Sequence, residues 1–195
     1  MHNDELYLIS ALRDGNVDYR IGKNYEIKIW QKDERWLTDV LKPIIERRFH
    51  CTVHVHGHLL RITNKRVVDD IRRLSGIKPW GWHTPAPVKL LPPSRRITYI
   101  RGFWDAEGGV PKHPERCHRA EQRYLSFHQK DREPLVFIRD TLISLGYRPT
   151  NITYCKGAHE FRITRAAHIV RFCREIGSLH PEKGERMRRL VKKIS

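Results

Sequence analysis

Two stretches of sequence, one in each half of the chain, decide the fold: Tyr7–Gly15 (YLISALRDG) and Ile100–Gly108 (IRGFWDAEG). Each is an apolar segment that ends in an acid followed by glycine, which is the pattern of a buried helix that ends in a left-handed glycine. The acids, Asp14 and Glu107, stand at the negative end of the helix dipole, which costs about 0.3–1 kcal/mol. Because this unfavourable arrangement occurs twice, we expect it to serve function.

The two acids also suggest what that function needs. If the two helices pack side by side, Asp14 and Glu107 meet at the axis between the halves, where their charges repel unless a cation neutralises them. Carboxylate oxygens are hard ligands of the kind that Mg²⁺ prefers. The sequence therefore predicts Asp14 and Glu107 as metal ligands. The alternative is a pair of solvated acids at helix ends.

Segments outside the two motifs repeat in the same order. Residues 31–33 (QKD) reappear as residues 129–131, and residues 61–63 (RIT) reappear as residues 162–164. A histidine stands three residues before each RIT triplet. Several matches in one order indicate an internal duplication.

Hydrophobic periodicity predicts an α+β fold with the order αββαββα in each half and antiparallel hairpins. We expect an N-terminal repeat over residues 1–76, a linker with five prolines over 77–94, and a C-terminal repeat over 95–195. In the first half the predicted elements are a helix at 5–14, a hairpin at 17–30, a helix from 33 through 45, a hairpin at 53–63 and a helix at 65–75. In the second half they are a helix at 95–107, strands at 109–117 and 122–130, a helix at 132–145, strands at 150–155 and 158–164, a helix at 165–176, and an extra basic helix at 181–194.

Composition limits the classes of partner. The 195 residues include 38 Lys and Arg against 22 Asp and Glu, a formal charge of +16, so nucleic acid is the first partner to consider. No segment approaches the ~20 apolar residues of a membrane span, and we expect no membrane partner. The four cysteines form no Cys-x-x-Cys pair, which argues against a zinc finger or a disulfide framework.

The second motif, Gly102–Gly108, closely resembles the signature of the LAGLIDADG homing endonucleases. The first motif differs: it has Ile9 where glycine is usual, and its small residue, Ser10, lies four rather than five positions before the acid. The resemblance covers the whole chain. It is to the single-chain, two-repeat type that acts as a monomer, as in archaeal intron-encoded members.

This resemblance implies two sheets that form a saddle over DNA, with the motif helices at the interface between the halves. It implies a metal-dependent double-strand break with short 3′ overhangs at a long target site, with two or three Mg²⁺ ions and Mn²⁺ or Ca²⁺ as substitutes. Intron RNA would be a second partner. We expect a cytoplasmic, nucleoid-associated protein in a cell without a nucleus, or an organellar one. The alternative is a cleavage-deficient DNA- or RNA-binding member, such as an intron-splicing maturase or a transcription regulator.

The duplicated Gln-Lys pairs stand at the ends of the second strand of each half. In the family, a Gln and a Lys near this place organise the attacking water and stabilise charge, which implies catalytic roles for Gln31, Lys32, Gln129 and Lys130. Because Gln31 shares the alternation of the apolar Ile27, a buried strand end remains the alternative.

The polar side chains of the strands should face DNA, where Arg reads guanine and Asn reads adenine in the major groove. A solvated strand face is the alternative for each of them, and we expect His54, His56 and His58 to face the groove rather than bind a metal. In the first half the candidates are Asp18, Arg20, Glu26, Lys28, Trp30, His54, His56, Arg61 and Thr63. In the second half they are Arg116, His118, Arg123, Asn151, Thr153, Arg162 and Thr164.

Overall fold

The computed structural model describes residues 1–12, 15–20, 24–75 and 83–194, and at 15–20, 24, 75 and 121 it describes the backbone alone. The first half follows the predicted αββαββα order, with the second helix divided into η2 and α2. Its elements are α1 (Asn3–Ala11), β1 (Gly15–Arg20), β2 (Asn24–Trp30), η2 (Trp36–Leu41), α2 (Lys42–Phe49), β3 (His54–His56), β4 (Leu59–Ile62) and α3 (Lys65–Ser75).

Local chemistry explains how the divided helix begins and ends. Asp33 caps it as predicted, because its Oδ1 accepts the N–H of Arg35 at 3.2 Å. Pro43 lies at the start of α2 and has no N–H to donate along the helix, and the turns before it are the wide π turns of η2. The helix ends at His50, whose φ of 50° is left-handed.

The second half contains more irregular structure than the first. Its elements are α4 (Ala86–Lys89), η3 (Pro93–Arg96), α5 (Ile97–Glu107), β5 (Gly108–Gly109), η4 (Pro114–Arg116), η5 (Ala120–Gln122), β6 (Leu125–Gln129), α6 (Arg132–Ser144), β7 (Thr153–Cys155), β8 (Ala158–Ile163), α7 (Ala166–Glu175) and α8 (Pro181–Ile194).

The predicted strands at 109–117 and 122–130 are wrong in extent. Pro111 and Pro114 have no N–H for a strand ladder, so β5 stops at Gly109 and the 3₁₀ turns η4 and η5 occupy much of the segment before β6. The strand expected from residue 150 begins at Thr153.

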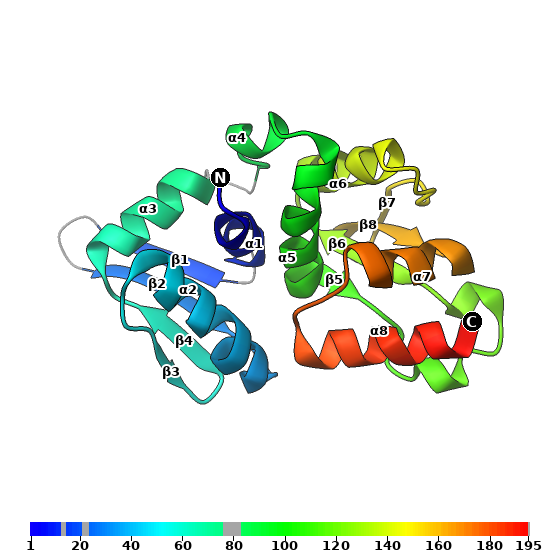
Figure 1. Ribbon diagram of the computed structural model, residues 1–195, viewed down its shortest axis with the longest axis horizontal. Helices are drawn as coiled ribbons and strands as arrows, with labels where there is room; N and C mark the ends of the chain where they lie inside the picture. Colours follow the sequence, from blue (N-terminus) through cyan, green and yellow to red (C-terminus); the bar gives the residue numbers. More distant parts are fainter. Residues whose placement is uncertain (13–14, 21–23, 76–82, 195) are drawn as a thin grey trace.

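The two sheets nevertheless have the same strand order, β1-β2-β4-β3 and β5-β6-β8-β7, and every pairing in them is antiparallel. They lie on either side of α1 and α5, which pack side by side at the centre of the molecule (Figure 1). This arrangement confirms the predicted α+β fold with two repeats.

Each half has its own core, and α1 contributes to both. Its Tyr7 and Leu8 pack with the inward side chains of β2 and β4, whereas its Leu6 and Ile9 pack with the core of the second half. This division explains why α1 is apolar nearly all round. The motif helices are therefore the structural contact between the halves.

The predicted linker, residues 77–94, is described from residue 83 on. There it includes the short helix α4, whose Val88 is fully buried in the core of the second half. At the other end of this half, α8 packs on α7 and η4. Among the described residues, no helix is both long enough and apolar enough to cross a membrane.

Candidate active site and nucleic-acid interface

The two motif helices approach closely at Ser10 and Gly102. Ser10 is fully buried, and a Cβ built at Gly102 would collide with the Ser10 Oγ and with the main-chain oxygen of Tyr7. Ser10 Oγ itself donates to carbonyls of its own helix, including that of Tyr7 at 2.9 Å. Small residues at this crossing therefore set the distance between the two halves.

The motif acid of α5 is its last residue. Glu107 is half-buried, and Gly108 continues in an extended conformation with φ of −85°. A left-handed glycine was expected there, and that expectation is wrong. Glycine is needed because a Cβ at residue 108 would collide with the Trp104 side chain and carbonyl.

The motif acid of α1 lies beyond the end of this helix, outside the described residues. α1 ends at Ala11 with Leu12 as its C-cap, and the acid is Asp14. The convergence of Asp14 and Glu107 therefore stays a prediction.

The duplicated Gln-Lys pair of the second half lies beside Glu107. Gln129 Nε2 donates to Glu107 Oε1 at 3.3 Å, and Gln129 Oε1 accepts the main-chain N–H of Lys130 at 2.7 Å. The amide is thus held in the orientation that points its donor at the acid. The Lys130 side chain is exposed.

In the first half, the Gln-Lys pair ends β2. Gln31 is half-buried and its main-chain N–H donates to the oxygen of His58 at 2.9 Å, while Lys32 is exposed. Gln31 is thus a half-buried residue at the end of the strand, and its catalytic role stays a prediction.

Asp105 is a functional-site neighbour that the sequence analysis missed. It is fully buried and accepts hydrogen bonds from Tyr7 Oη at 2.8 Å, from the Ser178 hydroxyl and from the Leu179 N–H at 2.9 Å. Burial raises the pKa of Asp105, although these donors oppose the shift. Tyr7 in turn accepts from Trp36 Nε1 at 2.9 Å, so the bonds link both halves.

Lys183 is a second residue that the sequence analysis missed. Its Nζ, from the first turn of α8, lies 2.6, 2.9 and 3.5 Å from the main-chain oxygens of residues 105, 106 and 104. An ammonium group therefore sits at the end of α5, next to Glu107. No local signal separates this lysine from the other basic residues of the helix.

The polar face of the first sheet carries the predicted basic residues. Lys28 is opposite Arg61 across β2 and β4, and Arg61 is opposite His54 across β4 and β3. Glu26 lies among them and is only 5% exposed, because it pairs with Arg61 and with Lys28 at 2.9 Å. The bond from Arg61 is the main reason that the pKa of Glu26 lies below its ordinary value.

The remaining candidates of this sheet lie near its edges. Trp30 is 57% exposed, and His56 and Thr63 are also exposed. The side chains of Asp18 and Arg20 lie outside the described set. His58 follows Gly57 in the turn and sits 5.7 Å from the Trp30 ring, so the three histidines do not share one strand face.

The polar face of the second sheet holds three residues that the sequence analysis did not name: Ser126, His128 and Glu160. His128 is opposite Glu160 and Ser126 is opposite Arg162 across β6 and β8. Glu160 pairs with Arg162 and lies 3.6 Å from His128, whose pKa is lowered mainly by burial. The alternation of Leu125–Gln129 could have identified Ser126 and His128.

The Ser126, His128 and Glu160 side chains form a chain of contacts like that of a serine hydrolase, with Ser126 Oγ 2.8 Å from His128 Nε2. Ser126 is 1% exposed, however, and lies against Gly109. A substrate cannot reach a buried hydroxyl, so this arrangement supports the sheet face rather than a nucleophile.

The other second-half candidates divide into two groups. Asn151, Thr153 and Arg162 line one pocket of about 290 Å³, and Thr164 follows β8 in an exposed position. The placement of Arg116, His118 and Arg123 on strands was wrong: Arg116 lies in η4, and the other two lie in irregular segments on either side of η5, before β6 begins. Arg123 donates to the carbonyls of Cys117 and His118 at 3.2 and 3.1 Å and so holds the loop.

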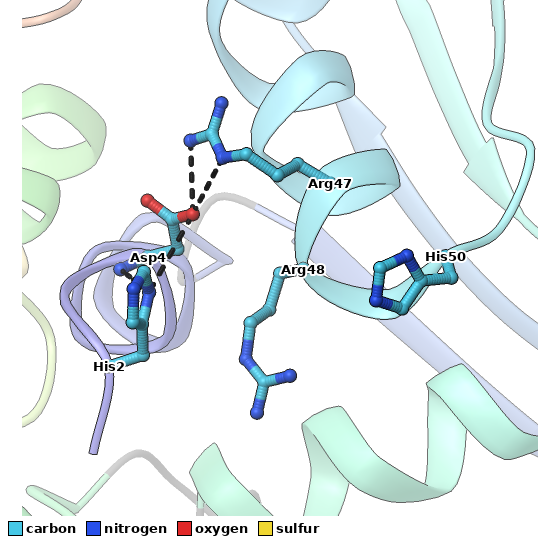
Figure 2. Close-up of a pocket in the computed structure, with 5 residues that line it drawn as sticks. All are labelled: His2, Asp4, Arg47, Arg48 and His50. Carbon is cyan, nitrogen blue, oxygen red and sulfur yellow. Dashed lines mark hydrogen bonds and ion pairs between the residues drawn. The ribbon is translucent and has the colours of Figure 1, made fainter.

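A further pocket of about 380 Å³ lies at the start of α1 and the end of α2 (Figure 2). The positive charges of its two arginines are neutralised by ion pairs: Arg47 pairs with Asp4 at 3.0 Å, and Arg48 pairs with Glu5. None of its lining residues belongs to the predicted site.

The carboxylate beside Gln129 fits a Mg²⁺ site to which the protein contributes only a few ligands. Mg²⁺ commonly takes one or two carboxylates and completes its shell with water and phosphate oxygens. Glu107 supplies one such carboxylate. In the described part of the chain, no group of three His, Cys, Asp or Glu side chains could hold a metal ion by itself.

Comparisons with known proteins agree with this arrangement. A family model described as a LAGLIDADG-like domain matches residues 95–177. The chain is 30% identical over 202 residues to homing endonuclease I-ApeI of Aeropyrum pernix, covering 95% of this chain and 86% of the relative.

Two solved structures share the fold. I-DmoI in complex with DNA and Mn has a TM-score of 0.65 at 18% identity and covers 89% of this chain and 96% of its own. The N-terminal LAGLIDADG domain of DUF199/WhiA has a TM-score of 0.56 at 13% identity and covers 91% and 84%. These two likenesses concern the fold alone. The identity to I-ApeI over nearly the whole chain, with which the LAGLIDADG-like match and the close packing of two motif helices agree, shows that this chain belongs to the LAGLIDADG homing endonuclease family.

Proposed function

We propose that the protein is a sequence-specific homing endonuclease that makes a Mg²⁺-dependent double-strand break with short 3′ overhangs at a long DNA target. One observation carries the proposal. Glu107 ends a motif helix that packs directly on the other motif helix, and Gln129 orients its carboxylate. A protein that only binds DNA has no need for an acid held in this way.

The two sheets support a long DNA target. Lys28, Arg61 and His54 are neighbours on one sheet, and Arg162 lies on the equivalent face of the other. Arginine and lysine on such faces bind phosphates or read guanine. The I-DmoI structures with the same fold are complexes with DNA and Mn, Mg or Ca, which supports the same partners here.

Hydrolysis of a phosphodiester needs an oriented water and stabilisation of developing negative charge. A bound divalent cation would supply acidification of water and neutralisation of the phosphate. Glu107 and Asp14 would hold it. Gln129 fixes Glu107 through its 3.3 Å bond, and the exposed ammonium of Lys130, with Lys32 in the other half, would offset charge on the phosphate.

We further propose that the chain acts as a monomer, since both motif helices come from one chain. It would act where its DNA lies, in the cytoplasm with the nucleoid or in an organelle. Intron RNA is a second partner that the family resemblance suggests. A cleavage-deficient DNA- or RNA-binding protein is the competing function.

The test is selection from a randomised duplex library. Wild type and an Asp14→Asn/Glu107→Gln double variant are incubated with the library and Mg²⁺, and the ends of all products are sequenced. We expect wild type to release one family of sites with matched breaks and short 3′ overhangs, and none in EDTA. If wild type enriches bound sequences and cuts none, the binding-only function replaces the proposed one.

A further inference from the structure

We propose that Lys183 is a positioning residue of the active centre: it fixes the last turn of α5 and so holds Glu107 in place for its metal ion. This inference rests on the proposed endonuclease function. On this proposal, α8 contributes to the active centre of the nuclease and is more than an extra basic helix.

The end of α5 needs a cation. The last carbonyls of a helix have no partner within the helix, and together they form its negative end. Glu107 adds a carboxylate at the same place. Without compensation, these negative groups repel the acid and loosen the turn that carries it. The compact ammonium of Lys183, with three donors, reaches three of these oxygens.

The position of Lys183 in its own helix supports the same conclusion. It lies in the first turn of α8, at the positive end of that helix, where a cation is unfavourable. The positive charge of Lys183 is therefore unfavourable at the start of α8 and favourable at the end of α5. This combination indicates that Lys183 serves the contact between the two helices.

The start of α8 is held by both halves of the molecule. Asp33, from the first half, accepts the N–H of Glu182 at 3.1 Å. Just before α8, His180 stacks on Trp36 with ring centroids 5.1 Å apart, and Ser178 donates to Asp105. Lys183 is therefore fixed relative to α1, η2 and α5 together, as a positioning residue must be.

The first test compares Lys183→Met, Lys183→Gln and Lys183→Arg. Single-turnover cleavage of the selected target is measured with Mg²⁺ and saturating protein, and target affinity is measured in Ca²⁺. We expect the Met variant to cut about ten- to thirtyfold more slowly, which corresponds to the upper end of the effect of a partly buried cation at a helix C-terminus, with affinity changed about twofold at most. Arg keeps the charge and should restore most of the rate, whereas Gln keeps donors alone and should not.

The matched control is Lys192→Met, which removes the same charge from an exposed position of α8. Within the described part of the chain, Lys192 makes no hydrogen bond or ion pair. Its cleavage rate should stay within about twofold of wild type.

A second test needs neither metal nor DNA. The N–H of Gly108 donates to the carbonyl of Trp104, which Lys183 also contacts. Hydrogen exchange of the Gly108 amide in the free protein should accelerate about tenfold in Lys183→Met and stay unchanged in Lys192→Met.

The outcomes separate the two proposals. If wild type cuts no DNA, the endonuclease function fails. If wild type cuts and Lys183→Met cuts at the same rate, only the role of Lys183 is overturned. If the Met variant does not fold, Gln and Arg decide: a folded Gln variant with the wild-type rate overturns the proposal, and rescue by Arg alone supports it.

Discussion

β1 and β5 hold the same place in their sheets, yet β1 has six residues and β5 has two. In the first half the strand pairs with β2 along a full hairpin. In the second half prolines end the strand early, and α8 packs on the 3₁₀ turn η4 that follows. The duplication thus preserved the strand order and allowed the outer part of each sheet to diverge.

The two motif helices differ in a related way. α1 ends at Ala11, while α5 continues to Glu107 and has Lys183 at its last carbonyls. The loss of sheet in the second half accompanies the gain of α8, which reaches the centre of the molecule. Equivalent motifs therefore need not have equivalent surroundings, and experiments on each half should give different results.

The largest expected effect on stability comes from the crossing that both halves share. Gly102→Val puts side-chain atoms where Ser10 Oγ and the Tyr7 carbonyl lie, and the free energy of unfolding should fall by about 3 kcal/mol. Ser10→Ala removes a hydroxyl that bonds within its own helix, and should cost about 1 kcal/mol or less. Denaturant titration measures both. A Gly102→Val variant as stable as wild type would mean that the helices are not closely packed.

The second effect concerns the connection of α8 to the first half. His180 is buried against Trp36, and burial, with Lys183 and Arg186 nearby, lowers its pKa to about 4 despite Asp33. A histidine whose folded pKa is lowered gives stability that is present above its unfolded pKa, about 6.5, and is lost as the pH falls towards the folded value.

We therefore expect wild type to lose about 2–3 kcal/mol of unfolding free energy through this residue between pH 6.5 and pH 4. His180→Phe keeps a stacking ring and removes the titration, so its pH profile should be flatter by that amount. Titratable groups that do not contact His180 are common to both proteins and cancel in the difference, whereas Asp33 loses its histidine partner in the variant. Parallel profiles would show that His180 is not buried as described.

The smallest effect compares the two sheet faces. Arg61→Ala leaves Glu26 paired with Lys28, whereas Arg162→Ala leaves Glu160 beside His128, which is neutral at pH 7 because burial lowers its pKa. The second change exposes a less compensated negative charge to DNA. We expect target affinity to fall about tenfold for Arg162→Ala and about threefold for Arg61→Ala.

The control for this pair is Arg73→Ala on α3. The Arg73 side chain is 77% exposed and pairs with Asp70. Its affinity should change about twofold at most. Equal losses at Arg61 and Arg162 would mean that the two faces contact DNA alike.

The local sequence pattern was sufficient to predict most helices and strands of the first half. The alternation around Ile27 and Ile29 predicted β2, and Asp33 caps the next helix as expected. In the second half, Pro111 and Pro114 argue against the long strand that the predicted pattern contained. The assignment of Arg116 and His118 to a strand failed for that reason, whereas Arg123 precedes β6 because this strand begins three residues later than predicted.

Contacts between distant segments could not be predicted in this way. Asp33 and Glu182 are 149 residues apart, and Lys183 meets the end of α5 across 77 to 79 residues. When only the sequence is considered, the acid at the end of α5 faces the negative end of the helix dipole, which is unfavourable. The structure shows the cation that offsets it, and this cation belongs to a helix with no counterpart in the described part of the first half.

The central claim is that Glu107 is the carboxylate of a metal-dependent nuclease centre. Single-turnover cleavage of the selected target by wild type and Glu107→Gln, with Mg²⁺, tests it most directly, with affinity in Ca²⁺ measured on the same samples. We predict that the variant cuts slower by on the order of a thousandfold and binds the target within about tenfold of wild type. Cleavage by Glu107→Gln at the wild-type rate would contradict the claim.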